Sequence, residues 1–111
     1  SFTPSARAYS CAQEIAAQAN RERSAASILA QKVTENNSVA NLNIYCKKTK
    51  AVCEEDFSRD IQSQEWICQL RYDSIRRSEL ARATGSSQKK AKRKAAMLLL
   101  SNLGSSTACK N

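Results

Sequence analysis

Apolar and polar residues alternate most regularly between residues 65 and 73. Every second position of this segment is apolar: Trp66, Cys68, Leu70 and Tyr72. A period of two residues with one apolar face is typical of a half-buried β-strand, and we expect Trp66 to belong to the core. Weaker strand patterns occupy residues 53–60 and 75–83, and a tight turn near Asp73 and Ser74 precedes the latter. The pattern therefore predicts three consecutive strands.

Helical spacing replaces this alternation on both sides of the predicted strands. Residues 38–48 carry apolar side chains three and four positions apart, with Ser38 as the predicted N-cap. After Gly85 the chain predicts a second helix, which Gly104 is expected to end. The core face predicted for that helix comprises Ala91, Ala95, Leu98 and Leu99.

A further helical segment is predicted before residue 38. Thr3 is the expected N-cap and Pro4 the first helical residue. Residues 4–35 are rich in good helix formers, but the apolar phase is interrupted around residues 20–24. The segment is therefore either one kinked helix or two.

The order of these elements predicts an α+β fold. From residue 38 it is α-β-β-β-α, a three-stranded antiparallel sheet with two helices on one face. We expect this domain to span residues 38–104, with an N-terminal helical extension at 1–37 and a flexible tail at 105–111.

Charge is distributed unevenly along the 111 residues. The net charge is +8, and residues 71–94 alone carry nine cations and two acidic residues. Five of those cations lie between Lys89 and Lys94, at the start of the predicted last helix. Such a cluster repels itself unless a polyanion or solvent screens it, so the pattern indicates a surface that faces nucleic acid. The cluster also resembles a basic nuclear-import signal.

The remaining composition argues against several functional classes. The chain has five cysteines, no histidine and no Cys-x-x-Cys, so we expect no metal site and no cofactor. Buried free thiols favour an intracellular location, nuclear or cytoplasmic. No apolar run is long enough for a membrane span. No nucleophile–base pair is evident, and we expect residues 54–56 to be a solvated acidic edge, so no catalytic residues are predicted.

Two motifs make residues 38–103 resemble the double-stranded RNA-binding domain (dsRBD) family. Residues 39–47 look like its first helix, and residues 87–92 followed by Ala95 and Ala96 look like its lysine-rich second helix. The resemblance implies recognition of RNA shape by the first helix, the loop between the first two strands and the second helix. Because the chain begins with Ser1, we expect it to be a module of a larger RNA-processing or RNA-remodelling protein.

The resemblance also assigns candidate RNA-binding residues. In the second helix, Lys89 and Lys92 are the expected phosphate ligands, with Ser87 and Gln88 as neutral donors. Lys90, Arg93 and Lys94 are expected to point elsewhere and to add long-range attraction. The remaining candidates are Asn43 and Lys47 on the first helix and Arg59 at the short loop.

Departures from the family pattern leave a second hypothesis open. Gln88 replaces a signature lysine, Ile44 stands where the family often has glutamate, and the loop at 58–64 lacks the family's Gly-Pro and His. Met97 and Leu100 point away from the predicted core face, so either the N-terminal helix or a protein partner should cover them. The alternative function is therefore protein interaction or self-association, with weak or no RNA binding.

Overall fold

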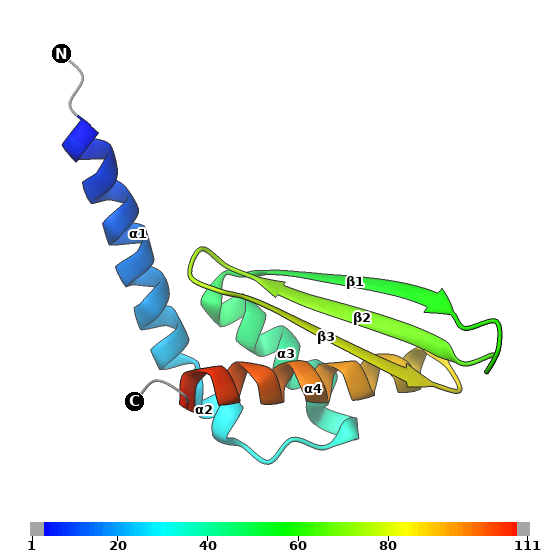
Figure 1. Ribbon diagram of the computed structural model, residues 1–111. Helices are drawn as coiled ribbons and strands as arrows, with labels where there is room; N and C mark the ends of the chain where they lie inside the picture. The colour runs from blue at the N-terminus through cyan, green and yellow to red at the C-terminus, as the bar shows by residue number, and fades with distance from the viewer. Residues whose placement is uncertain (1–3, 109–111) are drawn as a thin grey trace.

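The computed structural model describes the backbone of residues 4–108 and the side chains of residues 12–104. Its elements, in chain order, are α1 (Pro4–Ser24), α2 (Ala26–Ala30), α3 (Glu35–Thr49), β1 (Val52–Arg59), β2 (Trp66–Asp73), β3 (Ser78–Gly85) and α4 (Gln88–Ala108). The strands form one antiparallel sheet in the order β1-β2-β3. Helices α3 and α4 lie on the same face of that sheet (Figure 1). The predicted α-β-β-β-α fold is confirmed.

The core lies between the sheet and these two helices. On β2, Cys68, Leu70 and Tyr72 are at most 2% exposed, as their alternation predicts. Trp66 is only half-buried, although it packs against the same core. The third strand begins at Ser78 rather than at residue 75, because residues 74–77 form the turn. Ser74 closes this turn by donating its N–H to the carbonyl oxygen of Arg77 at 2.9 Å.

Helix α3 begins three residues earlier than predicted. Thr34 caps it in place of Ser38: its hydroxyl oxygen accepts the Asn37 N–H at 3.3 Å, and the Asn37 side chain accepts the Thr34 N–H at 2.8 Å. This reciprocal pair is a capping box. Ser38 is instead fully buried and donates its hydroxyl to the carbonyl oxygen of Arg93 at 3.0 Å. The hydroxyl thus joins α3 to α4.

Helix α4 continues beyond its predicted end. It runs to Ala108, so Gly104 does not terminate it, and the expected flexible tail is helical as far as residue 108. The rest of that tail, residues 109–111, lies outside the described residues. Around Gly104 there is open space, because a Cβ placed there would meet only the Leu29 Cβ, at 4.0 Å. This glycine sits where α2 passes close to α4.

The N-terminal segment forms two helices rather than one. Helix α1 begins at Pro4, the predicted first helical residue, while the expected cap Thr3 lies outside the described residues. The break falls at Ala25, which is fully buried. Helix α2 then packs on α4, where Ile28 is 6% and Leu100 only 3% exposed. The N-terminal segment therefore contributes to the same core as the sheet.

Two positions on α4 differ from the predicted core face. Leu100 is buried rather than outward-facing, and Leu98 is 47% exposed rather than in the core. Leu100 shares one helical stripe with Ala96 and Leu103, both buried, and α4 packs against α2 and α3 as well as the sheet. The N-terminal segment, one of the two covers expected for Leu100, thus supplies a second packing surface for α4. Met97, the other expected outward residue, is half-buried.

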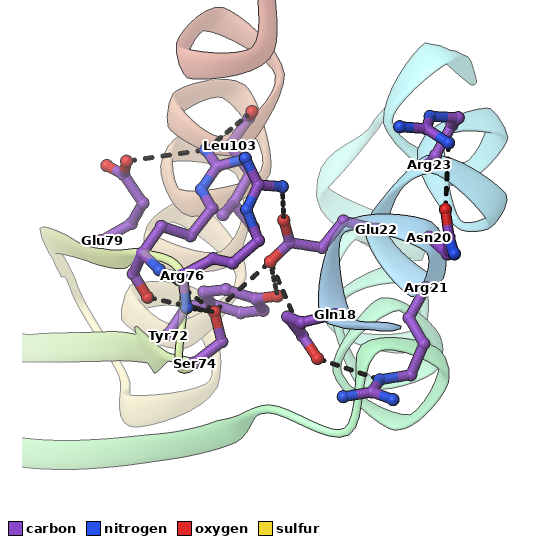
Figure 2. Close-up of polar contacts among 11 residues, drawn as sticks. Gln18, Asn20, Arg21, Glu22, Arg23, Tyr72, Ser74, Arg76, Glu79 and Leu103 are labelled. Carbon is purple, nitrogen blue, oxygen red and sulfur yellow. Dashed lines mark hydrogen bonds and ion pairs between the residues drawn. The ribbon is translucent and has the colours of Figure 1, made fainter. Parts of the chain in front are cut away.

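A buried carboxylate fastens α1 to the turn between β2 and β3 (Figure 2). Glu22 is 7% exposed, and its Oε1 accepts a hydrogen bond from Arg76 at 2.8 Å within an ion pair. Its Oε2 accepts from the hydroxyls of Tyr72 at 3.2 Å and Ser74 at 3.3 Å and from the Gln18 amide at 3.1 Å. Beyond these contacts α1 projects away from the body of the domain (Figure 1).

Candidate nucleic-acid interface

Gly85 and Ser87, which lie shortly before α4, position its cationic start. A Cβ on Gly85 would lie 2.7 Å from the Ala91 backbone nitrogen, so only glycine permits this close approach of β3 to α4. The Ser87 hydroxyl oxygen accepts the Lys90 N–H at 3.2 Å and so caps the helix. Capping uses the hydroxyl oxygen of Ser87 as an acceptor. The hydroxyl hydrogen can still donate to a phosphate, which is the role predicted for Ser87.

The polar and charged side chains in the first two turns of α4 differ in their exposure. Gln88, Lys89, Lys90 and Lys94 are exposed, whereas Lys92 and Arg93 are half-buried. Backbone N–H groups and the helix dipole add positive potential at this end. The start of α4 therefore offers both free side chains and a fixed field to a phosphate backbone.

A groove of about 450 Å³ runs between α3 and the start of α4. Its lining residues are Asn36, Val39, Ala40, Asn43, Lys89, Lys92 and Arg93. Four residues proposed from the sequence for two separate contact regions thus lie in one groove. Arg93 was expected to point elsewhere, but it lines the groove together with Lys89. Asn36, which the sequence did not single out, lies in the same groove because α3 begins at Glu35.

A second hollow continues along α3 from Asn43, which lines both. It is lined by Asn43, Ile44, Cys46, Lys47, Lys50 and Ala51 and measures about 590 Å³. Lys47 was predicted for this surface, but Lys50 was not. Lys50 follows the last residue of α3 with a left-handed φ of 53°. Sequence reasoning could have found it from its place directly after the helix, where a cation also complements the dipole.

One of the expected phosphate ligands already has a partner. The Lys92 Nζ lies 2.8 Å from Glu55 Oε2, and the two side chains are 34% and 45% exposed. Glu55 pairs across the sheet with Leu70, whose side chain is buried, so Glu55 lies on the helix-facing side of edge strand β1. The groove is therefore bordered by a carboxylate that is paired with Lys92.

Arg59 occupies the third expected contact region. Its guanidinium carbon lies 5.4 Å from the centre of the Trp66 ring, and its Nε donates to the carbonyl oxygen of Gln64 at 3.4 Å. Arg59 pairs with Trp66, and Trp66 pairs with Gly85 on the next strand. The loop between β1 and β2 therefore lies at the same end of the sheet as the start of α4 (Figure 1).

A family model described as "Double-stranded RNA binding motif" matches residues 38–103. This match covers more than half of the chain and includes most of both helices and all three strands of the sheet domain. The chain belongs to the double-stranded RNA-binding motif family. Membership confirms the resemblance seen in the sequence and supports binding of double-stranded RNA at the level of the family. No curated protein is similar enough to the chain to count as a match.

Parts of this dsRBD chain fall outside that match. Helices α1 and α2 and the first turn of α3 precede residue 38, although they pack against the matched region. Among the described residues, no helix is long and apolar enough to cross a membrane. The same residues contain no group of three or more His, Cys, Asp or Glu side chains placed to hold a metal ion.

Proposed function

We propose that this dsRBD binds duplex RNA by its shape, mainly through phosphate contacts from the groove between α3 and α4. The observation that carries the proposal is the meeting of Asn43, Lys89, Lys92 and Arg93 in that one groove. An amide and three cations on two rigid helices suit a polyanionic backbone with 2′-hydroxyl groups beside it. None of these side chains needs a particular base, so binding should be indifferent to duplex sequence.

The contact regions at the two ends of the groove extend this surface. Lys47 and Lys50 add positive charge along α3, and Arg59 adds it at the loop beside the start of α4. Ile44 cannot make the hydrogen bond that the family often makes from its first helix, and the loop at 58–64 lacks the family's Gly-Pro and His. The family footprint is about 16 base pairs. With two weakened contacts, we expect a shorter footprint here.

The test is a titration of a fluorescent duplex RNA of about 20 base pairs, longer than the family footprint. Duplex DNA of the same sequence and single-stranded RNA serve as controls. We expect micromolar or tighter binding to duplex RNA alone. With about four phosphate contacts, affinity should fall about 100-fold between 50 and 200 mM salt. Equal binding to all three nucleic acids, abolished by salt, would mean an unspecific cationic patch and would contradict the proposal.

The same proposal extends to the kind of protein to which this dsRBD belongs. We infer a binding module without catalytic activity of its own, belonging to an intracellular RNA-processing or RNA-remodelling protein. The support is the dsRBD family match together with the surplus of cations on the groove. Catalysis, if the parent protein performs any, would then depend on residues elsewhere in that protein.

The alternative of a protein-interaction domain has lost its main argument. Leu100 was expected to be covered either by the N-terminal helix or by a partner, and it is buried on α4, against which α2 packs. Leu98 is exposed instead, at 47%, which is ordinary for a single surface leucine. Sedimentation of the chain over a range of concentrations would distinguish the two functions. A stable dimer that fails to bind duplex RNA would favour the alternative.

A further inference from the structure

The hollow on α3 adjoins the proposed phosphate groove. It measures about 590 Å³, within the range of about 300–1,000 Å³ that is typical of sites for small ligands. Asn43 lines both the hollow and the groove, so the two form one continuous surface. A ligand in the hollow would therefore lie directly beside RNA bound in the groove.

The hollow is lined in part by apolar side chains, which duplex binding does not explain. These are Ile44, Cys46 and Ala51, of which Ile44 is 46% exposed. Helix α3 buries its opposite side in the core, so Ile44 faces outward. The minor groove of a paired A-form helix presents hydroxyl groups and base edges, and the backbone presents phosphates. None of these groups is matched by an isoleucine side chain, so the apolar lining points to a different group of the RNA.

Two lysines complete the lining. Lys47 follows Asn43 by about 6 Å along the helix axis, and Lys50 comes directly after the end of α3. Both lysines are exposed, and no residue described in the structure forms an ion pair with either of them. Among the described residues that line the hollow, none is acidic. The hollow therefore offers unpaired positive charge to a phosphate group, unlike the groove, where Lys92 is paired with Glu55.

We propose that this hollow binds one unpaired nucleotide, so that the dsRBD prefers RNA duplexes with a bulged nucleotide to perfectly paired ones. The base lies against Ile44 and Ala51, and its phosphate contacts Lys47 and Lys50. The inference rests on the proposed function, because the groove must hold the adjoining duplex. The family description names double-stranded RNA only, and an unpaired nucleotide goes beyond it.

A bulged nucleotide suits this site because its base is already unpaired. Extruding a paired base breaks its hydrogen bonds and its stacking, whereas a bulged base has no partner to lose. Its flat face can pack on an apolar side chain, as flipped bases do in other proteins. The Asn43 amide carries a donor and an acceptor, the combination that matches the edge of adenine. A bulged adenosine is therefore the probe that this lining favours most.

Three RNA duplexes of about 20 base pairs test the proposal with the intact chain. The first is perfectly paired, the second has one central bulged adenosine, and the third has a bulged abasic nucleotide at the same position. We expect the adenosine bulge to bind about three- to ten-fold more tightly than either of the others, as burial of the exposed part of Ile44 implies. The abasic duplex separates contact with the base from the added flexibility of the RNA.

Two isoleucines provide the matched variant and its control. Ile44→Gln should abolish the preference for the adenosine bulge but change the affinity for the perfect duplex less than about two-fold, because phosphate contacts dominate that affinity. Ile15→Gln changes a residue with the same exposure, 46%, on α1 and should keep the full preference. Glutamine is at least as good a helix former as isoleucine, so both helices should persist.

Three results would overturn the inference. They are equal wild-type affinity for the perfect duplex and the adenosine bulge, an equal gain from the abasic bulge, and a preference for adenosine that persists in Ile44→Gln. The first two come from the wild-type chain alone, so misfolding of a variant cannot obscure them. In all three the perfect duplex is still bound, and the proposed function stands. Failure to bind any of the three duplexes would contradict both the inference and the proposed function.

Discussion

Glu55 and Lys92 form an ion pair of 2.8 Å at the edge of the groove, although Lys92 is one of the two lysines best placed to contact phosphate. The pair is partly exposed, and such pairs contribute about 0.2–1 kcal/mol. Replacing Glu55 by glutamine removes both the competing partner and a charge that repels RNA. We therefore expect Glu55→Gln to raise affinity for duplex RNA about two- to five-fold in the fluorescence titration.

Glu54 supplies the matched control for this prediction. It has the same charge and lies next in the chain, but strand alternation turns its side chain to the opposite face of the sheet from Glu55. Glu54→Gln should change affinity by less than half as much, at the same salt concentration. An equal gain from both variants would mean that only net charge matters and that the ion pair has no special role.

Two pairs of lysines on α4 should differ in their effect on RNA binding. Lys89 and Lys92 line the groove, whereas Lys90 and Lys94 are exposed outside it. We expect Lys89→Ala with Lys92→Ala to weaken binding at least ten-fold across all duplex sequences and to reduce the salt slope by about 2. The measurement is the same titration, repeated at four salt concentrations.

A second double variant, Lys90→Ala with Lys94→Ala, removes the same charge from the same helix. It should weaken binding less than about three-fold, because those side chains contribute only long-range attraction. If both double variants lost the same affinity, the groove would not be the phosphate site.

Much of the fold could be predicted from local patterns. The alternation on β2 was sufficient because one face of that strand is buried and the other is not. The N-cap of α3 could not be chosen from the pattern, since Thr34 and Ser38 are both good capping residues and only the backbone decides between them. Leu100 lies off the core face predicted for α4, and the sequence could not decide between the N-terminal helix and a partner as its cover, because no spacing in the sequence encodes the packing of α2 on α4.

Of the candidate site, too, only the features that depend on neighbouring residues in the sequence could be predicted. The cations of α4 were evident from the sequence because they are adjacent in it. The ion pair of Lys92 with Glu55 depends on how β1 lies against α4, and no spacing in the sequence encodes that distance. Glu22 was missed for a similar reason, since its partners Tyr72 and Arg76 are 50 or more positions away.

Loss of the Glu22 charge should destabilise the whole domain rather than α1 alone. Its carboxylate accepts hydrogen bonds from Tyr72, Ser74 and Arg76 in a buried position, and glutamine cannot accept from all of them or neutralise the arginine. We expect Glu22→Gln to lower the free energy of unfolding by about 1–3 kcal/mol. Urea denaturation followed by circular dichroism measures this. Glu14→Gln, an exposed position on the same helix, should change it by less than 0.5 kcal/mol.

The reactivity of Cys53 should depend on pH in the neutral range. Its pKa is lowered to about 7 by the hydrogen bond from Cys46, so the reactive thiolate predominates above pH 7 and is lost below it. We expect the rate of Cys53 alkylation by iodoacetamide, followed on the tryptic peptide 51–59, to reach half its maximum near pH 7. In Cys46→Ala, which removes the hydrogen-bond donor, the half-maximum should move upward. A wild-type rate that still rises steeply at pH 9 would contradict the lowered pKa.

Gly85 and Gly104 should respond in opposite directions to the same substitution. In Gly85→Ala the new Cβ would lie 2.7 Å from the Ala91 nitrogen, and since that atom is backbone, the start of α4 must shift. We expect a loss of about 1–3 kcal/mol in unfolding free energy and a several-fold loss of RNA affinity, because Lys89 and Lys92 move with the helix.

In Gly104→Ala the nearest atom to the new Cβ is 4.0 Å away, an ordinary contact, and the residue lies within a helix. Alanine is the better helix former, by about 1 kcal/mol. The free energy of unfolding should therefore stay constant or rise by up to that amount, with RNA affinity unchanged. Urea denaturation and the RNA titration of both variants measure the contrast. If Gly85→Ala kept full stability and affinity, the close approach of β3 to α4 would not be what positions Lys89 and Lys92.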